Sequence, residues 1–92
     1  MADEARYEVI VATQVRRALS DTLPSGAAFA VFEFIDGPLA ERPHQVGAPL
    51  RAPFERYFRA RRGAYRLRYL IDEEARVVTV VDVSHRSDAY RT

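Results

Sequence analysis

The order of the elements predicted along this chain of 92 residues indicates an α+β fold. A short run rich in β-branched residues comes first, and two segments with apolar residues at helical spacing follow it. Three segments typical of strands complete the chain. We therefore expect an N-terminal strand and a helical hairpin packed on a mainly antiparallel four-stranded sheet, with residues 1–92 forming one domain.

The first strand and the first helix are predicted from the N-terminal quarter of the chain. Tyr7–Ala12 is rich in β-branched residues and is typical of a short strand. Thr13 is a plausible N-cap for the helix behind it. That helix should end at Leu23-Pro24, because a residue before proline is disfavoured in the α region.

The second helix is predicted between a serine and a glycine-proline pair. Ser25 can cap it, and Gly37-Pro38 should stop it, since glycine suits the position after the last turn and proline cannot continue the helix. Phe29 and Phe32 lie at helical spacing within it. We expect these two rings to pack in the core rather than to form a ligand site.

A long connection joins the helices to the remaining strands. Pro38–Pro53 contains four prolines and one glycine, and is too long for a tight turn. We expect it to wrap around the body of the domain. His44 lies there alone with no second ligand at metal spacing, so it predicts a loop histidine and no metal site.

The second half of the chain predicts three strands. They span Arg56–Arg61, Tyr65–Ile71 and Val77–Val83, with a turn at 62–64 and a hairpin loop at 72–76. The last strand is apolar on both faces for most of its length, as an interior strand would be. The tail, residues 84–92, should leave the end of that strand.

Alternation along these strands separates an inner face from an open one. We expect the helical hairpin to cover the face that bears Phe58, Leu67 and Tyr69. Tyr65 alternates onto the same inner face. The open face should then carry four arginines: Arg59, Arg61, Arg66 and Arg68.

Composition excludes several classes of function. The chain has no cysteine, which excludes disulfides, iron–sulfur clusters and thiol nucleophiles. No apolar run is long enough to span a membrane, and the acidic N-terminus lacks the apolar region of a signal peptide, so we expect a cytoplasmic protein. Residues 51–68 hold seven arginines and one acid. This cluster fits a polyanion such as nucleic acid, an acidic protein partner, or a solvated basic face.

Several segments resemble the RelE/ParE toxin superfamily. Gly63–Tyr69 matches the G-x-Y-R-h-x-Y strand of the family, and Val83–Tyr90 contains its H-R-x-D-x-Y ending. The acidic turn after Ile71 and the valine-rich strand behind it also match. Gly37–Leu39 and Pro43–Leu50 resemble the loop of RelE-type members. The resemblance covers most of the chain, and the order and spacing of the motifs favour the RelE branch.

The resemblance implies the toxin of a type II toxin–antitoxin pair, with an acidic antitoxin as its partner. RelE-like members cleave mRNA in the ribosomal A site by attack of the 2′-OH on the adjacent phosphate, without a metal or other cofactor. The alternatives are a ParE-like inhibitor of DNA gyrase and an inactive member that binds only its antitoxin. A stand-alone RNA-binding domain is a weaker alternative, since the aromatic pair of RRM domains is absent from the open face.

The family motifs assign the candidate site residues. Arg66 should contact the scissile phosphate, and Arg86 aligns with a second phosphate-binding arginine. Tyr90 aligns with a tyrosine that stacks on a flipped base or assists proton transfer, and otherwise would pack the chain end. The complete sets are catalytic residues Arg59, Arg66, His85, Arg86 and Tyr90, and RNA-binding residues Tyr57, Arg61 and Arg68.

The general base differs from that of relatives with lysine pairs. The chain has no lysine, and arginine is always protonated, so it cannot serve as an ordinary base. His85 is the best proton carrier available, since the unperturbed pKa of histidine is about 6.5. The alternative is that His85 only helps to pin the tail to the sheet.

Overall fold

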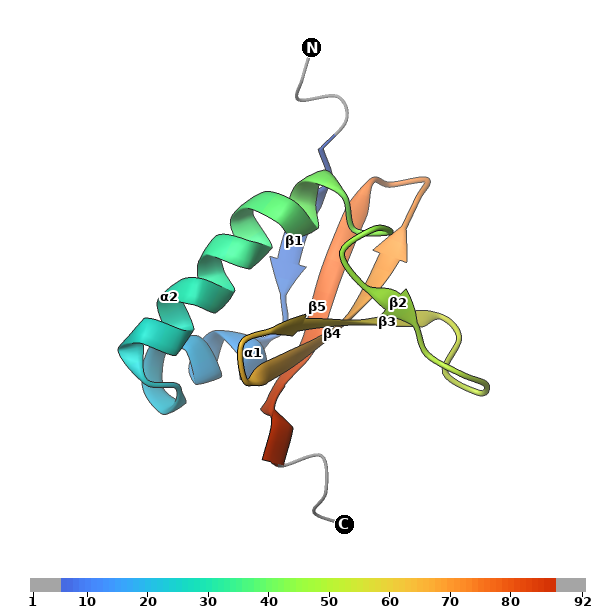
Figure 1. Ribbon diagram of the computed structural model, residues 1–92. Coiled ribbons are helices and arrows are strands. Elements are labelled where there is room, and N and C mark those ends of the chain that lie inside the picture. The colour runs from blue at the N-terminus through green and yellow to red at the C-terminus, as the bar shows by residue number, and fades with distance from the viewer. Residues whose placement is uncertain (1–5, 88–92) are drawn as a thin grey trace.

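The computed structural model describes residues 6–87, whose strands form one five-stranded sheet with the helices on one side (Figure 1). The strands lie in the order β1-β5-β4-β3-β2, with β1 and β5 parallel and the other neighbours antiparallel. The α+β class is confirmed, and a two-residue edge strand, β2, joins the four predicted ones. The elements are β1 (Glu8–Val11), α1 (Thr13–Arg17), the π-helical η2 (Ala18–Thr22), α2 (Ser25–Phe34), the π-helical η3 (Ile35–Leu39), β2 (Ala48–Pro49), β3 (Tyr57–Arg62), β4 (Tyr65–Asp72) and β5 (Val77–His85).

The three C-terminal strands form where alternation predicted them, within two residues at each end. Gly63 has φ 61° in the turn between β3 and β4, a left-handed conformation that suits glycine. β5 lies between β1 and β4, so its two edges are both hydrogen-bonded. This interior position explains why it is apolar on both faces.

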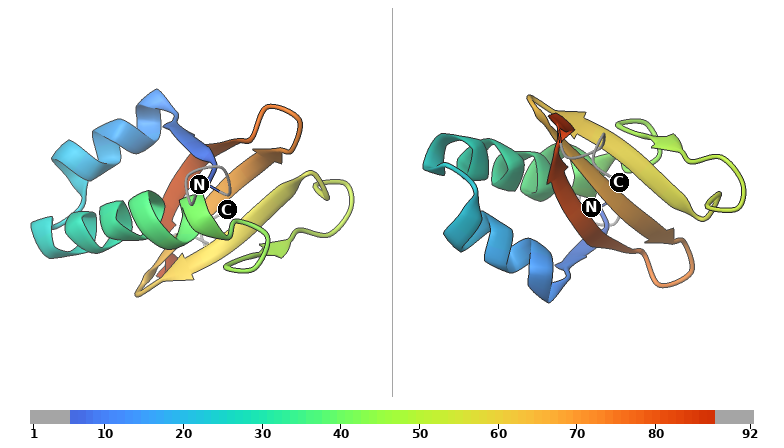
Figure 2. Two further views of the ribbon diagram at one scale, coloured as in Figure 1. Left: turned by 90° about the horizontal axis from the view of Figure 1, so that it is seen from above. Right: turned by 90° about the horizontal axis from the view of Figure 1, so that it is seen from below.

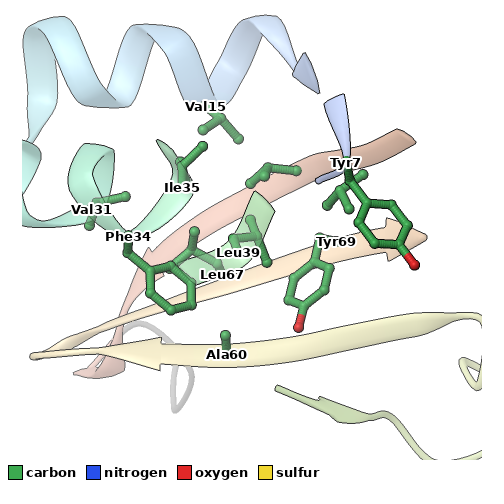
Figure 3. Close-up of a cluster of buried hydrophobic side chains, with 11 residues drawn as sticks. Tyr7, Val15, Val31, Phe34, Ile35, Leu39, Ala60, Leu67 and Tyr69 are labelled. Atoms are coloured by element: carbon green, nitrogen blue, oxygen red, sulfur yellow. The ribbon is translucent and has the colours of Figure 1, made fainter. Parts of the chain in front are cut away.

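The core lies between the helical hairpin and one face of the sheet (Figure 3). Leu67 and Tyr69 of β4 are fully buried there, together with Val31 and Leu39 from the helical side. The Tyr69 hydroxyl donates a hydrogen bond of 2.6 Å to the Pro43 carbonyl, and burial raises the pKa of Tyr69 to about 12. The prediction that the hairpin covers the face of Leu67 and Tyr69 is confirmed.

Both predicted helix caps are wrong. Thr13 and Ser25 are the first helical residues, and Ala12 and Pro24 occupy the cap positions without a side-chain hydrogen bond. The carbonyl groups of Ala12 and Pro24 accept the first helical hydrogen bonds, from Arg16 and Ala28. The polar side chain therefore lies one residue too late in each case to satisfy the free N–H groups.

The predicted stop at Gly37-Pro38 is also wrong, because the helical path continues through η3. Pro38 lacks an N–H group, and the wider π-helical turn accommodates this loss without ending the helix. The Pro38 carbonyl then accepts a hydrogen bond of 2.8 Å from the Arg42 N–H. Within residues 6–87, no helix is long and apolar enough to cross a membrane.

The predicted burial of Phe29 and Phe32 is contradicted as well. Their exposed fractions are 62% and 55%, and α2 and η3 instead bury Val31, Phe34 and Ile35. The segment is apolar on nearly all sides, so spacing alone does not determine which stripe meets the sheet. Phe32 lines an apolar hollow of about 400 Å³ between the hairpin and β1.

The connection after η3 is held close to the sheet at Gly47. A Cβ atom at this position would lie 2.3 Å from the Tyr69 hydroxyl and 2.7 Å from the backbone oxygen of Arg59. No side chain fits unless β2 moves away from β3. This close approach explains why the connection follows the sheet edge.

We expect Gly47→Ala to destabilise the protein by about 1–3 kcal/mol, because overpacking forces the backbone to shift. Urea denaturation measures this change. Gly37→Ala is the matched control, since an added Cβ would meet nothing within 4 Å and alanine favours a helix. Equal stability of Gly47→Ala and the parent protein would contradict the packing described here.

Candidate functional site

Four arginines lie together on the face of the sheet that the helices leave open. In the register of β3 and β4, Arg59 lies opposite Arg68 and Arg61 lies opposite Arg66. Paired strand residues point to the same face, so the four guanidinium groups form one basic surface, which we call the arginine face. The right-hand view of Figure 2 looks onto this side, where no helix crosses β3 or β4. The predicted grouping of these four residues is confirmed.

The charges of the four arginines are not equally available. Arg68 donates to Asp82 of β5 over 3.3 Å, so its charge is partly neutralised. Arg66 is half-buried, and among the residues described its Nε is a buried nitrogen with no hydrogen-bond partner. A buried N–H donor without a partner is costly unless a ligand accepts from it. Arg66 therefore has an unused donor on the arginine face.

Arg86 joins this surface from the end of β5. Its backbone N–H donates a hydrogen bond of 2.7 Å to the Ala64 carbonyl, which fixes the chain beside the turn between β3 and β4. A hollow of about 210 Å³ is lined by Arg61, Arg66 and Arg86 together with the turn. Three guanidinium groups around one small hollow can bind a phosphate group through several charge-assisted hydrogen bonds.

An irregularity in β5 determines which side chains face the arginines. Arg68 pairs with Asp82 but the next residue, Tyr69, pairs with Val80, so Val81 is an extra residue in β5. Such a bulge exchanges the faces of all residues beyond it. Asp82 therefore lies on the arginine face, although strict alternation from Val80 would place it in the core. Sequence reasoning missed Asp82 because nothing in the sequence marks the bulge.

The same bulge places His85 on the face away from the arginines. β5 continues to His85, one residue beyond the predicted start of the tail, and His85 pairs with Tyr65. The two rings meet edge to face at 5.1 Å between centroids. The Ser87 N–H donates a hydrogen bond of 3.1 Å to Nδ1 of His85, so the neutral ring carries its proton on Nε2.

Of the two tyrosines predicted for the site, the structure describes only Tyr57. Tyr57 is half-buried at the start of β3, opposite Leu70, and shares the arginine face. Tyr90 lies outside the described residues. The structure thus brings together Arg59, Arg61, Arg66, Arg68 and Arg86, with Tyr57 at one end of the surface.

A second polar cluster links the connection after η3 to the end of the sheet opposite the turn between β3 and β4. His44 contacts the Glu73 carboxylate, and the Tyr7 hydroxyl donates to both Glu73 oxygens, at 2.9 and 2.8 Å. Hydrogen bonds from His44 and then Tyr7 hold the pKa of the Glu73 carboxyl below its ordinary value. Arg76 stacks on the Tyr7 ring at 4.1 Å. Local sequence patterns do not indicate that His44 contacts Glu73 and Tyr7, because both residues are distant from it along the chain.

Comparison with known proteins finds toxins of toxin–antitoxin systems. The family model of the ParE toxin of the type II toxin–antitoxin system parDE matches residues 9–90. Toxin RelE of Mycobacterium tuberculosis is 40% identical over 91 residues, which is 99% of this chain and 93% of RelE. Toxin RelG of the same organism is 46% identical over 85 residues, covering 92% of this chain and 97% of RelG.

A solved structure supports the same relationship. The toxin–antitoxin complex RelBE2 of M. tuberculosis contains a chain with a TM-score of 0.83 and 44% identity. The match covers 91% of this chain and 95% of that one.

Proposed function

The chain belongs to the ParE toxin family of type II toxin–antitoxin systems, and from this premise we propose that it is a RelE-type endoribonuclease that cleaves mRNA in the ribosomal A site. The observation that carries the proposal is the clustering of Arg61, Arg66 and Arg86 around one hollow on the open face of the sheet. An inhibitor that binds only through protein contacts does not need three arginines around one hollow. The proposed place of action is the cytoplasm, where mRNA is translated.

The proposed reaction uses the substrate's own 2′-OH as the nucleophile. A base removes the 2′ proton, the oxygen bonds to the adjacent phosphorus, and the bond to the 5′ oxygen breaks as that oxygen gains a proton. The products are a 2′,3′-cyclic phosphate and a 5′-OH. Preorganised hydrogen-bond donors would stabilise the negative charge that develops on the phosphate in the transition state.

We assign the phosphate contacts to Arg66 and Arg86, with Arg59 on the same face. The unused Nε–H of Arg66 is an available donor for a phosphate oxygen. Tyr57, Arg61 and Arg68 are proposed to bind the RNA on either side of the cleaved bond, and Tyr90 to stack on a base or assist proton transfer. Arginine suits these roles because its planar fork can donate two parallel hydrogen bonds to one phosphate.

The proposed proton carrier is His85, although its ring lies on the face that carries Tyr65. We expect His85→Ala to flatten the dependence of the cleavage rate on pH near neutrality, because it removes the proposed proton carrier. Single-turnover cleavage on programmed ribosomes across pH measures this. His44→Ala is the control, since it removes the other histidine of the chain from the far end of the sheet.

An unchanged rate and an unchanged pH profile in His85→Ala would end the case for His85 as the base. Its contact with Tyr65 would then serve to pin the tail, and proton transfer would pass to Tyr90, the substrate or the ribosome.

The antitoxin is proposed to be acidic and to act on the same surface. Its acidic segment would lie across the arginine face, or displace the tail that carries Arg86 and Tyr90. Either arrangement covers the cluster that we propose binds the scissile phosphate, which explains how binding would silence the toxin.

Expression of the toxin without its antitoxin tests the proposed function directly. We expect translation to stop and primer extension on cellular mRNA to reveal cuts inside translated frames. Intact mRNA together with an early stop of DNA replication would replace this proposal with gyrase inhibition.

A further inference from the structure

The loop between β2 and β3 holds an aromatic ring outside the core. Phe54 is 53% exposed and does not pack against the core cluster. Its backbone is fixed from both sides, because its N–H donates to the Arg51 carbonyl at 2.8 Å and its carbonyl accepts from the Tyr57 N–H at 3.0 Å. The Leu50 N–H also donates to the Tyr57 carbonyl, at 2.9 Å. An ordered loop that exposes a large apolar ring suits a ligand with an apolar surface.

Two arginines flank Phe54 along the chain. Arg51 and Arg56 are exposed, and within residues 6–87 neither guanidinium group forms an ion pair. Of the two, Arg51 lies outside the acidic hollow that Arg56 helps to line. An exposed aromatic ring near an exposed cation is a combination that proteins use for single-stranded RNA, since the ring stacks on a base while the cation contacts a flanking phosphate.

The loop lies at one end of the arginine face. It leads directly into β3 (Figure 1). The residues of β3 on the arginine face are Tyr57, Arg59 and Arg61. At about 3.3 Å per strand residue, Tyr57 and Arg61 are roughly 13 Å apart. A single strand with its phosphate at Arg61 and Arg66 can therefore extend along β3 to reach Phe54 within a few nucleotides.

Acidic residues mark the limit of this basic track. A hollow of about 670 Å³ is lined by Arg56 together with four carboxylates: Glu55, Asp72 at the end of β4, and Glu73 and Glu74 in the turn after it. Phosphates would be repelled from that hollow. The favourable path for RNA thus runs along the arginine face and ends at the loop.

We propose that Phe54 is a stacking platform for an unpaired base of the mRNA, with Arg51 contacting a neighbouring phosphate. This inference rests on the proposed function and deepens it. Stacking at a fixed distance from Arg66 sets the register of the mRNA, so it contributes to the choice of the phosphate that is cleaved.

Kinetics on mRNA-programmed ribosomes test the proposal. We expect Phe54→Ala to raise KM by about 5- to 150-fold, the range for loss of one stacked base, with little change in kcat. Phe54→Trp should restore KM, because its larger ring also stacks. Phe29→Ala is the matched control, since this exposed ring lies on α2, away from the arginine face.

If Phe54→Ala has the same KM as the parent protein, the stacking proposal is wrong, and the endoribonuclease proposal remains intact. Failure of the parent protein to cleave would instead contradict the endoribonuclease proposal. An mRNA with an abasic nucleotide at the stacked position should raise the parental KM to the value of Phe54→Ala. If an abasic nucleotide raises the parental KM at no position of the mRNA, Phe54 does not stack on a base of the mRNA and the proposal is wrong.

Fluorescence provides a second test, because the chain contains no tryptophan. The tryptophan of Phe54→Trp should be quenched by single-stranded RNA, and that of Phe29→Trp should not. The anisotropy of labelled RNA shows the RNA concentration at which binding is saturated. At that concentration, equal quenching of both tryptophans would overturn the proposal. Quenching of neither tryptophan would overturn it as well.

Discussion

Arg66→Ala is expected to reduce mRNA cleavage by roughly 10²–10³-fold while leaving the protein folded. The loss follows from removing a preorganised donor to the developing charge on the phosphate. The guanidinium group reaches the arginine face from β4, the central strand of the sheet, and its Nε has no partner among the described residues. Single-turnover cleavage on programmed ribosomes measures the rate, and urea denaturation measures the stability.

Three further variants sharpen this test. Arg66→Lys should recover part of the rate, since lysine keeps the charge but loses the fork. Arg68→Ala should cost less than Arg66→Ala, because Asp82 already neutralises Arg68 in part. Arg62→Ala is the matched control, because it removes a cation from β3 that lies over the Phe34 ring on the opposite face. Equal activity of Arg66→Ala and Arg62→Ala would remove Arg66 from the proposed site.

The rate at which the antitoxin associates is expected to fall at least about 10-fold between low and high salt, because unpaired charges steer the encounter. Stopped-flow mixing of toxin and antitoxin measures this rate. Arg61→Ala should weaken the salt dependence. Arg17→Ala, which removes the same charge from α1, should retain it. An association rate that does not change with salt would contradict this prediction and indicate that the apolar hollow beside Phe32 dominates binding instead.

The arginine face could be predicted from the sequence because alternation is a local property. Arg59, Arg61, Arg66 and Arg68 follow a period of two on adjacent strands joined by a short turn, so one register brings them together. The turn at Gly63 supplies that register through its left-handed backbone.

The position of His85 could not be predicted in the same way. Strict alternation from Val78 and Val80 would place Asp82 in the core and His85 on the arginine face. The extra residue Val81 reverses both placements. The carbonyl of Val81 accepts a hydrogen bond of 2.6 Å from Gln14 of α1, a tertiary contact that no local pattern indicates.

The helices differ from prediction for a related reason. The local signals at Ser25 and Gly37-Pro38 are weaker than the packing of the nearly all-apolar segment of α2 on the sheet. In that packing Val31 and Phe34 are buried in the core, and Phe29 and Phe32 are exposed.

The central claim is that this toxin cleaves mRNA through the arginine face. The most direct measurement is a single-turnover reaction of purified toxin with ribosomes that carry an mRNA codon in the A site, followed by analysis of the RNA ends. We expect one cut in the A-site codon, with a 2′,3′-cyclic phosphate and a 5′-OH at the new ends. Intact mRNA after this reaction, with inhibition of gyrase by the same preparation, would contradict the account.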